Sequence, residues 1–125
     1  MHKLLLMSGA IFSGLSVALG AFGAHALKDL LEKNQRADVF ETAVRYQFFH
    51  ALALILLGIL AQQMPHKFFN NAGYAFIAGI LIFSGSLYIL AVTNIRWLGA
   101  ITPIGGAAFI VGWVLMLLAI WGAKS

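Results

Sequence analysis

The 125-residue sequence lacks cysteine and contains few charged residues. The absence of cysteine excludes disulfides, thiolate metal sites and cysteine nucleophiles. Charged residues make up 10% of the chain and apolar residues 62%, whereas a soluble domain carries about 25% charge. So few charges cannot cover the surface of a soluble fold of this size. The composition therefore predicts a single domain, residues 1–125, that is surrounded by lipid.

The sequence also lacks any run of basic residues, although its formal net charge is +4. The eight Lys and Arg residues are spread along the chain, which is not typical of a nucleic-acid interface. An excess of this kind sets the orientation of membrane proteins and contacts anionic lipid. We therefore expect membrane lipids, and not nucleic acid, as partners.

Four long apolar stretches are separated by three short polar breaks. A helix needs roughly 20 apolar residues to cross the hydrocarbon core of a bilayer. We predict spans at about 4–24, 43–63, 72–92 and 103–122. The fold class is therefore an all-α membrane protein, a bundle of four transmembrane helices with both termini on one side. Residues 123–125 form a short tail that we expect in water.

The first apolar stretch has a second interpretation as a cleaved signal peptide. Lys3 precedes it, and residues 24–26 read Ala-His-Ala, a small-x-small pattern. However, the stretch is longer than the ~7–15 apolar residues of a signal peptide. We expect it to be retained as a span.

The break between the first two spans, residues 27–42, is the longest. Leucines alternate with charged residues over residues 27–33, which predicts a short amphipathic helix on the membrane surface. Asp38 and Glu41 have the spacing of a capping box at the start of the next helix. Glu41 and Arg45 are four residues apart, a favourable helical ion pair.

With four crossings, the polar side chains of all four spans converge in the leaflet beneath the long break. The candidate ligand-binding residues are His25, Thr42, Tyr46, Gln47, His50, Ser84, Ser86, Tyr88 and Thr102. His50 lies within an apolar span, where an unsatisfied polar group costs several kcal/mol. We predict that its ring hydrogen-bonds another helix. The cluster is either structural, the interpretation we favour, or a small polar pocket.

Three functional classes remain open for this cluster. We favour a non-enzymatic membrane module that binds lipid or a membrane partner. A small transporter is disfavoured, because no carboxylate lies in the apolar spans to carry a proton, although a His could do so. Two histidines on different spans suggest a haem or metal redox subunit, but no spacing motif supports it. We expect no cofactor and no metal.

Catalysis has little support. The only conceivable pairing is Ser84 or Ser86 with His50, without a third orienting group. We assign no catalytic residue and do not expect an enzyme.

Small residues recur at a spacing of four in three spans: Ser16-Gly20-Ala24, Ala75-Gly79 and Ala108-Gly112. Such rows let helix backbones approach closely, so that van der Waals packing holds them together. The motif itself does not distinguish packing inside the bundle from the interface of a homo-oligomer. We favour packing inside the bundle.

Several motifs occur together in one order. They are Gly20–Ala26 (GAFGAHA), Tyr46–Leu52 (YQFFHAL), Phe83–Tyr88 (FSGSLY), Thr102–Gly106 (TPIGG) and Gly112-Trp113. In these residues the chain resembles domain-of-unknown-function family 423, whose eukaryotic relatives are small transmembrane proteins. The resemblance implies a small multi-pass protein of the bacterial inner membrane. It implies no activity, substrate or cofactor.

The orientation in the membrane has two conflicting indications. The positive-inside rule counts Lys28, Lys33, Arg36, Arg45 and Arg96 on one side against Lys3, Lys67 and Lys124 on the other. That count places the long loop in the cytoplasm. An N-terminal tail as short as this one is usually retained inside, and relatives tend to carry basic residues in the second turn and the tail. We expect both termini inside.

Overall fold

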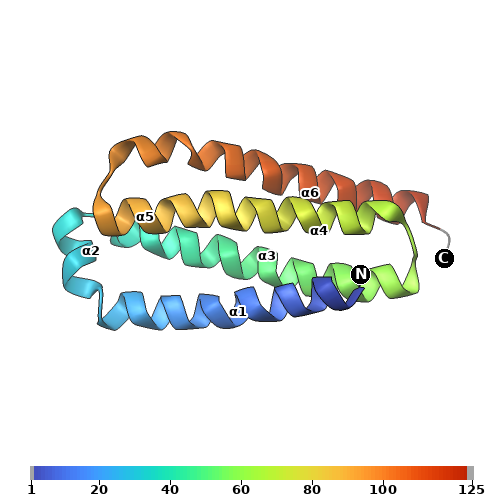
Figure 1. Cartoon of the computed structure of the whole chain (residues 1–125), viewed down its shortest axis with the longest axis horizontal. Coiled ribbons are helices and arrows are strands. Elements are labelled where there is room, and N and C mark those ends of the chain that lie inside the picture. Colours follow the sequence, from blue (N-terminus) through green and yellow to red (C-terminus); the bar gives the residue numbers. More distant parts are fainter. Residues whose placement is uncertain (1, 124–125) are drawn as a thin grey trace.

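A computed structural model describes residues 2–123, which contain helices and no strand (Figure 1). The elements are α1 (His2–His25), α2 (Lys28–Asn34), α3 (Ala37–Gln63), α4 (Lys67–Gly79), η1 (Ile80–Ser84), α5 (Gly85–Thr93), η2 (Arg96–Ala100) and α6 (Thr102–Gly122). η1 is one π-helical segment and η2 is a 3-10 turn. The tail residues Lys124 and Ser125 lie outside the described range, so the prediction made for them is not addressed.

Four segments are long and apolar enough to cross a membrane: His2–His25, Ala37–Gln63, Lys67–Thr93 and Arg96–Gly122. They lie side by side as a bundle, with both termini at one end and α2 at the other (Figure 1). The predicted fold class is confirmed. We call the end that carries α2 and η2 the loop end.

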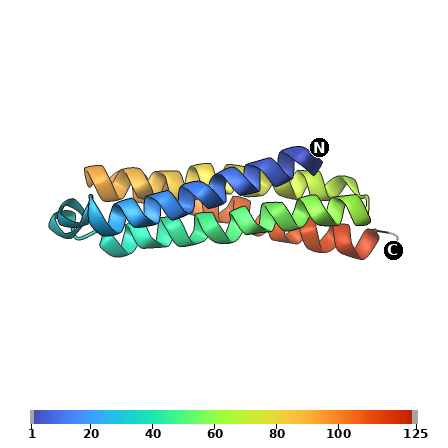
Figure 2. The ribbon, with the colours of Figure 1, turned by 90° about the horizontal axis from the view of Figure 1, so that it is seen from below.

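The bundle is built from two close helix pairs, α1 with α3 and α4 with α6. Figure 2 shows the first of these pairs, with α1 lying alongside α3. Glycines make the second pair possible. A Cβ on Gly79 would lie 2.3 Å from the ring of Phe109, and one on Gly112 would lie 2.5 Å from the ring of Phe76. Each phenylalanine therefore fills the space above a glycine of the facing helix. The two small-residue rows that contain Gly79 and Gly112 therefore pack inside the bundle.

The third span contains a π-helical segment that the apolar pattern did not indicate. η1 interrupts the α-helical hydrogen bonding over Ile80–Ser84. Its backbone passes very close to α6, because a Cβ on Gly105 would lie 2.3 Å from the backbone nitrogen of Phe83. Only a glycine permits this contact, since the opposing atom belongs to the main chain and cannot rotate away.

The predicted amphipathic helix exists as α2, and it is attached to the bundle by hydrogen bonds. The side-chain amide of Asn34 donates to the carbonyls of Ala91 (2.9 Å) and Val92 (3.2 Å) in the last turn of α5. Arg36 Nε donates to Asn94 Oδ1 over 3.1 Å. The final carbonyls of a helix have no partner within the helix, so Asn34 of α2 supplies a donor to the end of α5.

The predicted capping box at the start of α3 is wrong. Helix α3 begins at Ala37, and no side chain caps it, so Asp38 already lies within the first turn. Glu41 instead pairs with Arg45, whose Nη2 lies 2.7 Å from Glu41 Oε1. The predicted ion pair is therefore confirmed. A carboxylate in the first turn still suits the positive end of the helix dipole.

Candidate functional site: the loop half of the bundle

His50 is buried in α3 and bonded through both ring nitrogens. Its Nδ1 lies 2.8 Å from the carbonyl oxygen of Tyr46, and its Nε2 lies 3.0 Å from Nε1 of Trp113 in α6. The imidazole stacks on Phe109, with 3.6 Å between ring centroids. Only 6% of the residue is exposed. The prediction that His50 bonds another helix and does not face lipid is confirmed.

The partners of His50 determine its tautomer. An indole N–H can only donate, so Nε2 of His50 must accept from Trp113. Nδ1 then carries the proton and donates to the Tyr46 carbonyl. Both nitrogens are engaged, and neither has a lone pair free for a metal ion in this geometry. No group of three or more His, Asp or Glu residues within residues 2–123 is arranged to hold a metal.

Gln47 joins three helices through its side-chain amide. Its Nε2 donates to the carbonyl of Phe12 in α1 over 2.9 Å. Its Oε1 accepts from the hydroxyl of Tyr88 in α5 over 2.6 Å. The residue is 3% exposed, so these bonds satisfy an amide that would otherwise be costly to bury.

Three further candidates join helices in pairs. Ser84 Oγ donates to the carbonyl of Ala43 over 2.8 Å and so ties η1 to α3. The hydroxyls of Ser86 and Thr102 lie 2.7 Å apart and tie α5 to α6. Such bonds are typical of the polar groups that hold membrane helices together.

The remaining three candidates do not take part in these interhelical bonds. Thr42 Oγ1 donates to the Asp38 carbonyl within its own helix. Tyr46 contributes its carbonyl to His50 and packs its ring 4.6 Å from that of Phe83, but 40% of it is exposed. His25 is exposed at the end of α1. The predicted polar cluster is thus several separate contacts whose groups satisfy one another.

Sequence reasoning missed Trp113 as the partner of His50. The indole N–H in an apolar span was a usable signal, because a buried indole needs an acceptor and neutral His supplies one. The residue appeared in the Gly112-Trp113 motif but was not connected to α3.

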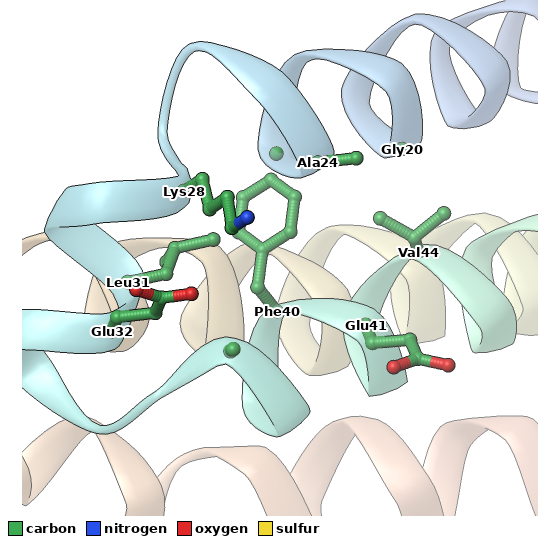
Figure 3. Close-up of a pocket in the computed structure, with 10 residues that line it drawn as sticks. Gly20, Ala24, Lys28, Leu31, Glu32, Phe40, Glu41 and Val44 are labelled. Carbon is green, nitrogen blue, oxygen red and sulfur yellow. The ribbon is translucent and has the colours of Figure 1, made fainter.

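A groove between α1 and α3 at the loop end encloses about 420 Å³ (Figure 3). Its floor is apolar and comes from Gly20, Leu31, Phe40 and Val44, and its charged rim comes from Lys28, Glu32 and Glu41. Figure 3 shows the Phe40 ring at the centre, with α2 on one side and Val44 on the other. We call this the α1–α3 groove.

Gly23 explains why the groove has this shape. A Cβ at that position would lie 2.4 Å from Cε1 of Phe40. The ring of Phe40 therefore lies directly beneath the end of α1. Gly20, one turn earlier, has only Val44 nearby, 3.5 Å from a placed Cβ, so the space above Val44 stays open.

The groove continues along α1 and α3, away from the loop end. A second hollow of about 300 Å³ shares Glu41 and Val44 with it and is also lined by Ser16, Val17 and Phe48. A third hollow, of about 530 Å³, lies beside His50 between Tyr46, Pro103, Ile110 and Trp113. It offers aromatic and aliphatic surface, because the nitrogens of His50 already have partners.

The four apolar helices, the buried interhelical hydrogen bonds and the groove at one end define a small multi-pass integral membrane protein. Residues 19–106 match the family described as "Protein of unknown function (DUF423)". The chain belongs to this family.

Two relatives illustrate the extent of the similarity. The UPF0382 membrane protein SH2409 of Staphylococcus haemolyticus is 46% identical over 117 residues, which cover 94% of each chain. The UPF0382 membrane protein YwdK of Bacillus subtilis is 45% identical over 118 residues, 94% of this chain and 95% of its own. No solved structure matches the chain. The resemblance found in the sequence is thereby confirmed.

Proposed function

We propose that this protein is a non-enzymatic module of the bacterial cell membrane that holds a lipid in the α1–α3 groove. One observation carries the proposal: the groove combines an apolar floor with a charged rim at the end of the bundle. A volume of about 420 Å³ falls in the range of roughly 300–1,000 Å³ that is usual for small-molecule sites. The bacterial relatives are named membrane proteins, which supports the assignment to the cell membrane.

The location of the groove suits a lipid better than a soluble ligand. Its lining includes the last turns of α1 and the first turns of α3, together with α2. These helix ends are where a span meets the headgroup region, so a lipid can place its headgroup at the rim and its chain against the floor. The polar contacts around His50 and Gln47 support a structural role, because their groups already have partners.

The experiment is native mass spectrometry of protein purified from its own membranes in a mild detergent. We expect the wild type to retain phospholipid and Gly20→Leu to lose most of it, because the leucine side chain would occupy the space above Val44. Gly14→Leu is the matched control: it lies on the same helix, and nothing lies within 4 Å of its placed Cβ. Equal lipid retention by the two variants would overturn the proposal.

A further inference from the structure

We infer that the α1–α3 groove selects phospholipids whose headgroup carries a primary ammonium. Lys28 binds the phosphate, and Glu32 accepts hydrogen bonds from the ammonium. This inference rests on the proposed function and adds the chemistry of the headgroup to it. It follows from the charges on the rim, the single aromatic ring of the lining and the course of the groove.

The first observation is that Lys28 and Glu32 both line the groove and are both unpaired. Among residues 2–123 the only salt bridge joins Arg45 to Glu41, and no side-chain hydrogen bond in this range involves Lys28 or Glu32. They are four residues apart on α2 with the lysine first, the less favourable order for a helical ion pair. Both side chains come from α2 and lie next to the floor formed by Leu31 and Phe40 (Figure 3). One positive and one negative group are therefore available at the rim.

The net charge of the rim decides between headgroup classes. Glu41 is neutralised by Arg45, whose guanidinium lies 2.7 Å away. Lys28 and Glu32 remain and cancel each other, so the rim is complementary to a zwitterion. An anionic headgroup such as phosphatidylglycerol would bind Lys28 through its phosphate but has no cationic group, so it would leave the charge of Glu32 without a partner, which is unfavourable.

The lining also separates a primary ammonium from a quaternary one. A primary ammonium donates N–H bonds to a carboxylate and forms a charge-assisted hydrogen bond. A choline group has no N–H and is recognised by the faces of several aromatic rings. Among the described lining residues Phe40 is the only aromatic one, and it is 4% exposed. The groove therefore has a carboxylate for an ammonium and no aromatic cage for choline.

The course of the groove points to a whole lipid and not to a free headgroup. Beyond Val44 the surface continues along Val17 and Phe48 toward Ser16, beside the Glu41–Arg45 ion pair. Ala24, which also lines the groove, and Ser16 are eight residues apart in α1, a rise of about 12 Å at 1.5 Å per residue. That apolar length accommodates the first half of an acyl chain. Affinity then comes from the chain, and selectivity comes from the rim.

The test is competition for delipidated protein in detergent among phosphatidylethanolamine, phosphatidylcholine and phosphatidylglycerol with identical acyl chains, read by native mass spectrometry. We expect the wild type to prefer phosphatidylethanolamine over either competitor by about three- to fivefold, the size of one exposed ion pair. Glu32→Gln should remove this preference while total lipid binding persists. Lys28→Met should lower the binding of all three lipids.

Two matched controls lie on the same helix. Asp29→Asn and Lys33→Met make the same charge changes at exposed positions outside the groove lining, so both should keep the wild-type preference. Soluble glycerophosphoethanolamine should not displace bound lipid, because it lacks the acyl chain. Circular dichroism and size-exclusion chromatography verify that each variant is folded.

The possible outcomes distinguish the headgroup inference from the proposed function. A wild type that prefers phosphatidylglycerol or phosphatidylcholine, or a Glu32→Gln variant with an unchanged preference, overturns the headgroup inference while lipid binding stands. Displacement by glycerophosphoethanolamine overturns the whole-lipid site in favour of a headgroup site. Lipid binding that is equal in Gly20→Leu and Gly14→Leu overturns the proposed function itself.

Discussion

The indole N–H of Trp113 in α6 donates to Nε2 of His50 in α3 over 3.0 Å. The two helices are not one of the close pairs of the bundle, since α3 packs mainly with α1 and α6 with α4. The bond therefore joins the two pairs. Phe109 reinforces the contact, because its ring lies between α3 and α4, stacked on His50 and above Gly79.

His50→Phe should destabilise the bundle by about 1 kcal/mol, close to the ~0.6–1.7 kcal/mol of interhelical hydrogen bonds in membranes. The phenyl ring keeps the stacking on Phe109 but leaves the indole N–H of Trp113 without an acceptor. The four spans should remain helical. Thermal unfolding in detergent measures the loss. A double-mutant cycle with Trp113→Phe should give a coupling of about 0.6 kcal/mol, and a coupling of zero would contradict the bond.

Gln47→Leu should loosen α1 selectively, because the amide of Gln47 connects α3 to the Phe12 carbonyl of α1. Tyr88→Phe is the matched control. It removes the other bond of the same amide and leaves the link to α1 intact. Each variant leaves a buried polar group unpaired, at a cost of about 1–2 kcal/mol. Hydrogen exchange should speed up in α1 for Gln47→Leu alone, and equal exchange in both variants would argue against this role.

Gly105→Ala should be the most damaging of three glycine-to-alanine changes. Its Cβ would lie 2.3 Å from the backbone nitrogen of Phe83, which cannot move aside, so we expect a loss of about 2–3 kcal/mol. Gly79→Ala should cost less, because the Phe109 ring it meets belongs to a side chain. Gly14→Ala should be neutral or up to about 1 kcal/mol stabilising, since nothing lies near it and alanine favours helix. Melting temperatures give the order, and an unchanged value for Gly105→Ala would refute it.

The absence of native cysteine allows a direct test of topology with single-cysteine variants in intact cells. Lys3→Cys and Lys67→Cys should react on one side of the membrane, and Arg96→Cys on the other, because two spans separate Lys3 from Lys67 and a third leads to Arg96. With both termini inside, only Arg96→Cys should react with an impermeant reagent. Labelling of Lys3→Cys from outside would reverse the orientation, and labelling of Lys3→Cys and Lys67→Cys from opposite sides would exclude four spans.

The small-residue rows show where sequence reasoning reached its limit. Gly20 and Gly79 occur in the same kind of row and were interpreted alike. In the structure Gly79 lies against Phe109, whereas Gly20 faces the open groove with only Val44 at 3.5 Å. Spacing identifies a face of a helix, but the distance to the neighbouring helix depends on side chains that are remote in the sequence.

The hydrogen-bond partners of the polar candidates were predictable only in part. An apolar environment requires buried polar groups to be satisfied, so the sequence alone predicted that His50 would bond another helix. It could not select Trp113, which is 63 residues away, because pairing depends on the register and rotation of α3 against α6. The partner of each other polar candidate also depended on that rotation.

The number of spans, the all-helical fold and the amphipathic α2 are predictable from the sequence, because hydropathy and the need to satisfy backbone groups in lipid act locally. Three features came from the packing of the helices instead: α3 carries no capping box, a π-helical turn lies opposite Gly105, and α1, α2 and α3 enclose a groove. At the rim of this groove Lys28 and Glu32 have no partner among residues 2–123. These features arise from the fit between helices, where contacts of a few ångströms depend on residues from distant parts of the chain.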